Sequence, residues 1–531
     1  MLSRRTAVAA VATAATLRLP SAWAQRARVL KFVPFVDLFS LDPVLTSVAA
    51  VRSHGYLVFD TLYGQAGSSH EYAIRPQMAA GHTIEDDGRV WTVTLRDGLR
   101  FHDGERVLAR DCVASIRRWA ARDAFGQALL QRTDALSTPD DRTLRFRLKR
   151  AFPLLPQALG KIGGTMCAIM PERLASTDPF RPVAEMVGSG PYRFRADERV
   201  PGVQVVYERF EDYRPRADGE AAEGTSGPKV AHFDRIEWHI MPDPATAAVA
   251  LQSGAVDVWE IPPTDLLPLI RSNARLKLEL VHESGFCAIL RPNHRSPPFD
   301  NPDARRAVLG AIDQRQFMTA AMGTDSALWH VPSGFFPPGS PFASGAGLAR
   351  LEQRRDNGRV REDLQAAGYK HEPVVLLGAA DVPSLKALND VADDALRALG
   401  MPVDYQSVDG NTMVQRRTVM APVQRGGWNA FCSAPTGADM FDPAVQLPLR
   451  GTGESAWPGW PTSARIEALR DAWLDAPDLE ARKRIAADIQ AQAFIDLPYF
   501  PLGVFYSPSA YRADLVGILR GLPLFWSIRR V

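Results

Sequence analysis

The chain has 531 residues, about the length of three average domains. Its 46% hydrophobic and 23% charged residues are typical of a soluble globular protein and exclude a disordered or fibrous chain. A formal net charge of +2 gives no basic surface for nucleic acid, and four cysteines are too few for a disulfide scaffold.

The N-terminus predicts an export signal over residues 1–24. Arg4-Arg5 precede a mildly apolar run at residues 7–19, which is too short for a membrane helix. Ala22-Trp23-Ala24 then gives an A-x-A cleavage site before Gln25. The two arginines favour the twin-arginine route, and the Sec route stays open. No cysteine follows the cleavage site, so we expect no lipid anchor and a soluble mature protein in a bacterial periplasm.

The mature chain begins with a strand predicted at residues 29–36. The turn Leu41-Asp42-Pro43 follows, and a helix then leads into residues 57–62. Alternating apolar and polar residues predict two further strands at residues 90–96 and 144–148. Asp111 is expected to cap the helix between them. The apolar positions expected to be buried are Trp91, Val93, Leu95, Cys112, Ile116, Trp119 and Ala120.

The middle of the chain is marked by a glycine turn. Gly188-Ser189-Gly190-Pro191 predicts a tight turn that feeds a strand from Tyr192. Residues 220–227 are rich in Gly, Ala, Ser and Glu and predict a solvated surface loop. The elements expected next are a strand at 236–240, a helix at 244–253 closed by Gly254, and a strand at 256–258.

The second half predicts alternating helices and strands. The expected elements are a helix from Asn301 to Met322, a strand at 374–377, a helix over 385–399, a strand at 403–408, a long helix containing Ile485 and Ile489, and a strand at 498–506. This strand–helix–strand order indicates an α/β lobe. Cys112, Cys167, Cys287 and Cys432 form no C-x-x-C pair; we expect buried free thiols, and one disulfide stays open in an oxidising compartment.

Five motifs, taken in chain order, resemble those of family 5 extracellular solute-binding proteins, the peptide-, nickel- and oligopeptide-binding components of ABC importers. The motifs are Leu95-Arg96-Asp97-Gly98-Leu99-Arg100-Phe101-His102-Asp103-Gly104, Gly188-Ser189-Gly190-Pro191-Tyr192, Leu251-Gln252-Ser253-Gly254-Ala255-Val256-Asp257, Pro298-Phe299 with Arg305-Arg306-Ala307-Val308, and Ala366-Ala367-Gly368-Tyr369. We interpret the adjacent His102 and Asp103 as turn chemistry rather than as a metal or catalytic pair.

The resemblance implies a mixed α/β fold of the periplasmic-binding-protein type (type II-like). It has two lobes and an extra subdomain inserted in lobe I. The implied boundaries are residues 28–62, 188–282 and 494–531 for lobe I, 63–187 for the inserted subdomain, and 283–493 for lobe II. Two chain passages, at residues 281–286 and 494–501, would form the hinge.

The resemblance also implies a periplasmic receptor, expected to be monomeric. It would capture a small ligand in an interlobe cleft by hinge closure and deliver it to an inner-membrane ABC transporter permease. The ligand is expected to be peptide-like or another polar organic solute; an oligosaccharide, an opine-like conjugate and a metal chelate stay open. No cofactor, metal site or nucleic-acid partner is expected.

The candidate ligand-binding residues under this resemblance are Phe39, Asp60, Tyr63, Phe286, Trp428, Asn429, Phe431 and Asp439. Asp60 stands where the family usually has a Glu beside the cleft, and a salt-bridging carboxylate is its alternative role. Phe431 stands where dipeptide-binding members have the Asp that pairs with the ligand's α-ammonium, so we expect no such clamp here. Trp428 would supply a stacking wall and Asn429 a donor and an acceptor. Burial in the core of lobe II is the alternative for Trp428 and Phe431.

The sequence contains none of the catalytic motifs searched for. G-x-S-x-G, H-E-x-x-H, a Walker A loop, G-x-G-x-x-G and a zinc-spaced Cys/His set are all absent. The alternative function is a secreted or periplasmic enzyme with an unrecognised site on the same fold. Turnover of a bound ligand would distinguish that enzyme from a binding protein.

Overall fold

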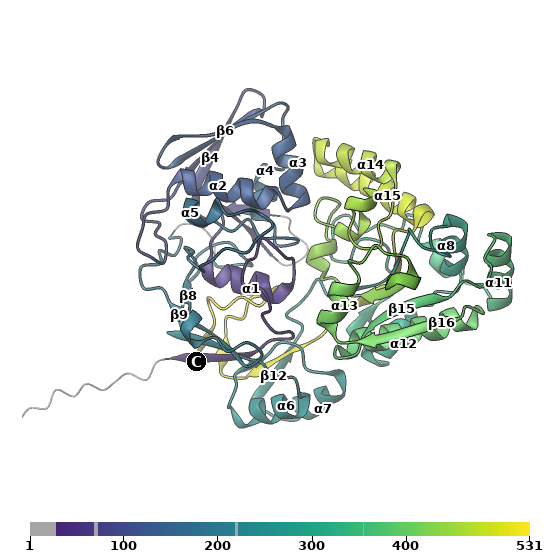
Figure 1. The fold of residues 1–531 in the computed structure, drawn as a ribbon. Helices are drawn as coiled ribbons and strands as arrows, with labels where there is room; N and C mark the ends of the chain where they lie inside the picture. Colours follow the sequence, from purple (N-terminus) through teal and green to yellow (C-terminus); the bar gives the residue numbers. More distant parts are fainter. Residues whose placement is uncertain (1–27, 68–72, 218–220, 354) are drawn as a thin grey trace, which may run out of the picture.

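The computed structural model describes residues 28–67, 73–217, 221–353 and 355–531, so the predicted export signal lies outside the described residues. These residues form two lobes that stand side by side (Figure 1). Each lobe has its own large sheet with helices packed around it, which confirms the predicted two-lobe α/β fold. Within the described ranges, no helix combines the length and the apolar character needed to cross a bilayer.

Lobe I is built around a seven-stranded sheet in the order β12-β19-β11-β1-β10-β9-β8. Its strands are β1 (Val29–Val33), β8 (Tyr192–Phe194), β9 (Gln204–Arg209), β10 (Arg235–His239), β11 (Val258–Trp259), β12 (Leu276–Glu279) and β19 (Ser509–Arg512). The central strand β1 runs parallel to both of its neighbours, β10 and β11. The helices of this lobe are α1 (Ala49–Val58), α6 (Pro244–Ser253) and α7 (Leu267–Arg271).

Lobe II is built around a six-stranded sheet in the order β14-β18-β13-β17-β15-β16. Its strands are β13 (Phe286–Pro292), β14 (Trp329–His330), β15 (Val374–Ala379), β16 (Val403–Val408), β17 (Ala430–Ser433) and β18 (Phe500–Phe505). Its helices are α8 (Pro302–Leu309), α9 (Gln314–Met322), α10 (Ala349–Glu352), α11 (Asn357–Ala366), α12 (Pro383–Ala398), α13 (Gly410–Arg416), α14 (Ala464–Asp475) and α15 (Leu479–Asp496).

A smaller four-stranded sheet lies at the upper end of lobe I in Figure 1. Its elements are β4 (Ala79–Glu85), β5 (Val90–Leu95), β7 (Thr143–Leu148) and β6 (Thr133–Asp140), with α2 (Ala109–Ala120), α3 (Ala124–Arg132), α4 (Leu155–Gly160) and α5 (Glu172–Ala175) beside it. The apolar positions predicted for β5 and α2 are all buried. Asp111 does not occupy the cap position: the helix begins at Ala109, and the Asp111 carboxylate reaches back to accept the Leu108 amide at 2.8 Å.

The chain passes between the lobes twice. The first passage, residues 280–285, joins β12 to β13. The second passage was predicted at residues 494–501 but lies at residues 506–508, because β18 still pairs with β13 in lobe II. The next strand, β19, pairs with β12 in lobe I. Residues 494–505 therefore belong with lobe II.

The helix predicted from Asn301 to Met322 is in fact two helices, α8 and α9. The break covers residues 310–313, because the Asp313 carboxylate accepts the Arg315 amide at 3.0 Å and so starts a new helix. Residues 311 and 312 are still buried, as their apolar character predicts.

In the loop predicted to be solvated at residues 220–227, residue 220 lies outside the described residues, and the rest is instead partly internal. Thr225 and Ser226 are fully buried, and Gln65 exchanges hydrogen bonds with Thr225 at 2.9 and 3.0 Å. These partners satisfy the polar groups of the loop, which explains how a polar segment is buried here.

The glycine turn at residues 188–190 is required by a close approach to the end of α1. A Cβ on Gly188 would lie 2.0 Å from the Val58 carbonyl oxygen, and one on Gly190 would lie 2.5 Å from that of Leu57. The His102 ring contacts the Gly190 carbonyl at 3.0 Å, so two of the sequence motifs meet in the fold. This contact agrees with a local structural role for His102.

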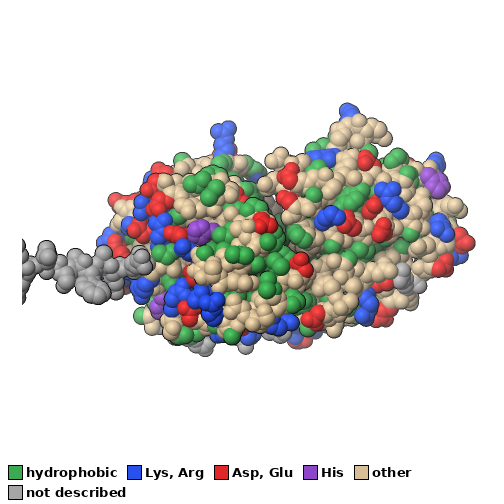
Figure 2. All heavy atoms as spheres, turned by 90° about the horizontal axis from the view of Figure 1, so that it is seen from below, with side chains coloured by type: hydrophobic (Ala, Val, Ile, Leu, Met, Phe, Trp, Pro, Cys, Tyr) green, Lys and Arg blue, Asp and Glu red, His purple; other side chains and the backbone are tan. Residues whose placement is uncertain are grey.

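The surface gives no single-sign charged face in the view from below, where Lys and Arg alternate with Asp and Glu (Figure 2). The formal net charge of +2 is consistent with this mixture. All four cysteines are buried and unpaired.

Candidate functional site

A cavity lies where lobe I meets lobe II. The lobe I side contributes Phe35, Arg52 and Glu260, and the lobe II side contributes Phe286, Thr436 and Asp442. The volume is about 50 Å³, which is room for only a few water molecules. The wall is mostly apolar with a few charged groups, the usual composition of a small-molecule site.

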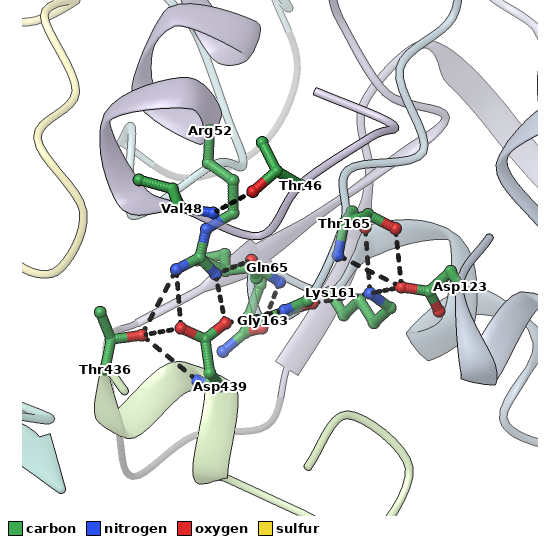
Figure 3. Close-up of polar contacts among 12 residues, drawn as sticks. Thr46, Val48, Arg52, Gln65, Asp123, Lys161, Gly163, Thr165, Thr436 and Asp439 are labelled. Carbon is green, nitrogen blue, oxygen red and sulfur yellow. Dashed lines mark hydrogen bonds and ion pairs between the residues drawn. The ribbon is translucent and has the colours of Figure 1, made fainter. Parts of the chain in front are cut away.

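One wall of the cavity contains an ion pair that joins the two lobes. Helix α1 positions Arg52, and the 3-10 helix η5 (Gly437–Met440) positions Asp439. The guanidinium binds both carboxylate oxygens, with Nη1–Oδ1 at 2.9 Å and Nη2–Oδ2 at 3.0 Å (Figure 3). Nη1 also donates to the Ile162 carbonyl at 2.7 Å. Such a bidentate, largely buried ion pair requires a specific geometry, so it favours one relative position of the lobes.

The Asp439 carboxylate has further partners on both sides of the junction. It accepts the Gly164 amide at 2.9 Å from the lobe I side and the Thr436 hydroxyl at 2.6 Å within lobe II. At the same contact, a Cβ built on Gly163 would lie 2.1 Å from the Ala438 carbonyl oxygen. Only glycine therefore permits this approach of the two lobes.

A second buried ion pair holds the loop that makes this approach. Lys161 Nζ lies 2.8 Å from the Asp123 carboxylate, and both side chains are buried (Figure 3). Lys161 also donates to the Gly163 carbonyl at 2.6 Å. Asp123 at the same time caps α3 by accepting the amides of Phe125 and Gly126. The loop at residues 161–165 is thus fixed by charge-assisted hydrogen bonds before it meets lobe II.

Glu260 and His282 form the other polar part of the cavity wall. Glu260 Oε2 accepts the Phe35 amide at 2.7 Å, and Oε1 lies 3.6 Å from His282 Nε2. Burial raises the pKa of the Glu260 carboxyl to about 7 and lowers the pKa of the His282 imidazole to about 4, because each charged form loses its hydration. His282 Nε2 is buried and makes no hydrogen bond.

Two of the sequence-predicted residues lie at or beside this cavity. Phe286 lines it and stacks on Phe505 with ring centroids 5.3 Å apart. Asp439 lies next to the lining residue Ala438, although its carboxylate is already engaged by Arg52, Thr436 and Gly164.

Asp60 and Tyr63 are buried inside lobe I and do not line the cavity. Asp60 pairs with the buried Lys229 at 2.7 Å and accepts the Tyr213 hydroxyl at 2.9 Å. The Tyr63 hydroxyl contacts His82 Nδ1 at 3.0 Å. The geometry therefore favours the salt-bridging role for Asp60 over a place beside the ligand.

Phe39 lies outside this cavity, on the surface of lobe I. Its side chain is 51% exposed and borders a separate hollow with Met186 and Phe194. The ring therefore does not line the interlobe cavity in this structure.

Trp428, Asn429 and Phe431 are buried in lobe II rather than exposed to the cavity. The Trp428 ring lies 4.9 Å from that of Phe431 and donates to the Arg417 carbonyl at 3.1 Å. The Asn429 amide bonds the backbone of Val375 and Pro297. The structure thus places Trp428 and Phe431 in the core of lobe II, the alternative given for them, and it places Asn429 there as well. The physical reason is that the Trp428 and Phe431 rings pack inside a hydrophobic cluster of lobe II, whose other buried members are Val375, Leu377, Met413 and Trp460.

The prediction from the sequence missed Arg52, Lys161, Glu260 and His282. A signal for Glu260 was present: it directly follows β11, which runs parallel to β1. Ligands of such sheets bind beyond the carboxyl ends of parallel strands, where Phe35 also lies. Arg52 and Lys161 gave no signal, since only the folded chain shows them to be buried and paired.

Comparison with known proteins gives one family and a set of relatives. Residues 73–456 match the family described as bacterial extracellular solute-binding proteins, family 5 Middle. The probable peptide ABC transporter periplasmic-binding protein y4tO of Sinorhizobium fredii (strain NBRC 101917 / NGR234) is 35% identical over 503 residues, covering 93% of this chain and 92% of its own length. The glutathione-binding protein GsiB of Salmonella typhi is 23% identical over 476 residues, covering 86% of this chain and 85% of its own length.

Solved structures share the fold at low sequence identity. The binding protein AgaA of A. tumefaciens R10, in complex with agropinic acid, superposes with a TM-score of 0.78 at 19% identity, over 95% of this chain and 99% of that one. DppA of Helicobacter pylori, in complex with the peptide STSA, gives a TM-score of 0.77 at 19% identity, over 96% of this chain and 99% of that one. At this identity the likeness establishes the fold alone.

Proposed function

Because this chain belongs to the family 5 bacterial extracellular solute-binding proteins, we propose that it captures a small peptide-like solute between lobes I and II and delivers it to an ABC transporter permease. The family comprises solute-binding proteins of peptide ABC importers. The location of the site rests on one observation, the interlobe cavity. Its wall combines apolar and charged groups from both lobes.

The ligand enters while the lobes are apart, and the lobes then close on it. The cavity of about 50 Å³ is far smaller than the clefts of roughly 300–1,000 Å³ that hold organic ligands. The Arg52–Asp439 pair and the glycine contact at residue 163 keep the lobes together in this arrangement. Hinge motion about the two chain passages supplies the opening.

The protein acts by binding alone, as a periplasmic monomer without turnover of its ligand. Its export signal is removed near Ala24, by the twin-arginine route. Phe431 at the position of the family's usual aspartate supports a mode of ligand binding without that amine clamp. Asp439 does not replace the missing aspartate, because its oxygens are occupied by Arg52, Thr436 and Gly164.

Native mass spectrometry of the protein purified from a periplasm tests this proposal. We expect one co-purifying organic solute of low mass. Added back to the stripped protein, that solute raises the melting temperature as its concentration exceeds Kd, and it is recovered chemically unchanged. Conversion of the solute to a product would instead identify an enzyme. If no member of a di- and tripeptide panel raises the melting temperature, the peptide-like ligand class is contradicted.

A further inference from the structure

We propose that Glu260 and His282 form a subsite for a positively charged nitrogen of the ligand, with a primary ammonium as the best fit. The inference rests on the proposed function, because it specifies the chemistry of a solute held in the interlobe cavity. It places the cation on lobe I rather than at the position of Phe431 in lobe II.

The geometry provides a buried carboxylate without a counter-ion. Glu260 is 6% exposed and lines the cavity, and its backbone-bonded oxygen, Oε2, accepts only the Phe35 amide at 2.7 Å. Among the described residues, the His282 ring supplies the one basic nitrogen within 4.0 Å of this carboxylate, at 3.6 Å. That separation is too long for a hydrogen bond.

His282 adds an acceptor that has no partner. The residue is 7% exposed, lines the same cavity, and its Nε2 makes no hydrogen bond. Because burial lowers the pKa of this imidazole to about 4, the ring is uncharged near neutral pH and cannot neutralise Glu260. A neutral imidazole accepts a hydrogen bond at its unprotonated ring nitrogen.

The other charged groups on the cavity wall are already satisfied. Arg52 is paired with Asp439, and Lys161 is paired with Asp123. The Asp442 carboxylate accepts the backbone amides of Ala444 and Val445 at 2.7 and 3.0 Å. Glu260 is therefore the group on this wall that gains most from a cation supplied by a ligand.

An ammonium group fits the remaining surroundings. Its three N–H donors match Glu260 Oε1 and His282 Nε2, with one left for water or for the rest of the ligand. Phe35 and Phe286 also line the cavity, and the Phe286 ring lies 5.9 Å from the His282 ring. These apolar rings strengthen the charge–charge attraction by excluding water.

The test compares two probes that differ in one charge, trialanine and N-acetyl-trialanine, by calorimetry at pH 7. We expect acetylation to weaken binding by on the order of tenfold or more, because it removes the ammonium. Glu260→Gln should abolish this difference between the probes. The exposed Glu105→Gln, which keeps the same chemistry away from the cavity, should retain it.

Binding should also release protons. Burial raises the pKa of Glu260 to about 7 in the free protein, and a bound ammonium lowers it, so roughly half a proton leaves per ligand at pH 7. The binding enthalpy should therefore differ between phosphate and Tris buffers. In Glu260→Gln this buffer dependence should be lost.

Equal affinity for the two probes, or a Glu260→Gln protein that still discriminates between them, would overturn the subsite and leave solute binding intact. If neither peptide binds, methylammonium chloride decides the subsite separately, and the di- and tripeptide panel decides the ligand class. We expect methylammonium to raise the melting temperature above that in equal sodium chloride, and this increment to disappear in Glu260→Gln. Equal increments in the two proteins would overturn the subsite.

Discussion

Asp60 and Lys229 form a fully buried ion pair inside lobe I. Its partners are 1% and 0% exposed, and the Lys229 ammonium also lies over the Trp526 ring at 4.7 Å. Removing one charge from such a pair leaves the other buried without compensation.

We therefore predict that Lys229→Met lowers the free energy of unfolding by about 3–5 kcal/mol, since the Asp60 carboxylate loses its counter-ion. Lys483→Met is the matched control, because Lys483 pairs with Glu480 at the surface, and it should cost about 0–1 kcal/mol. Urea unfolding followed by fluorescence measures both. Similar losses in the two variants would show that the buried pair contributes no more than an exposed one.

At this scale the sequence was a poor guide to the site. Trp428 and Asp60 stood at positions that suggested ligand contact, yet both have partners inside a lobe. The reason is physical: an aromatic ring or a carboxylate serves equally well in a core and in a cleft, and only the pairing of distant segments decides between them. Glu260 was predictable in principle, from its place after a parallel strand.

Among the elements, the loop at residues 161–165 and the 3-10 helix η5 carry the contact between the lobes. At Gly163 the backbone lies so close to Ala438 that a side chain at position 163 would collide with the Ala438 carbonyl oxygen. Changes at this glycine should therefore affect closure without disturbing either lobe.

We predict that Gly163→Ala weakens ligand binding at least tenfold while the melting temperature of the free protein stays within a few degrees, because the added methyl group acts only when the lobes meet. Gly81→Ala is the control, since a Cβ there has no neighbour within 4 Å. Calorimetry with the co-purifying solute measures both variants. Unchanged affinity in Gly163→Ala would show that ligand binding does not need the close contact between residue 163 and Ala438.

Most elements could be predicted from hydrophobic periodicity, for example α6 with its Gly254 cap and the strand β16. The failures have local causes. Asp313 starts a second helix where apolar spacing continues unbroken, and hydrogen bonds with Gln65 bury a loop of polar composition. Neither cause is visible in a pattern of apolar residues.

For the whole molecule, a second ion pair joins the lobes at the far end of the junction. Arg132 of α3 lies 2.9 Å from Asp475 of α14, and these two helices face each other across the junction in Figure 1. Together with Arg52–Asp439, this contact stabilises the closed arrangement of the lobes.

We predict that the double variant Asp439→Asn/Asp475→Asn has a larger radius of gyration than the unmodified protein when both are free of ligand, because three interlobe ion pairs are lost. Asp439 pairs with Arg52, and Asp475 pairs with both Arg132 and Arg150. Saturating solute should reduce the radius of gyration in both proteins. Small-angle scattering measures this, with the exposed Asp488→Asn as control. Identical radii for all three proteins would argue against ion pairs as the closing contacts.

The two-lobe fold was accessible from the sequence because five motifs in order resemble one family. The second passage between the lobes was misplaced, since the strand predicted at residues 498–506 fits either sheet equally well. Only the pairing of β18 with β13 assigns them to lobe II.

The two chain passages between the lobes lie side by side at both of their ends. At the lobe II end Phe286 pairs with Phe505, and at the lobe I end Glu279 pairs with Ser509. A single flexible connection would let lobe II rotate in every direction relative to lobe I. Two adjacent connections leave mainly the rotation about the line that joins the two connections. Lobe II therefore has a single easy degree of freedom relative to lobe I. One distance between a pair of labels, one on each lobe, would then describe the whole motion.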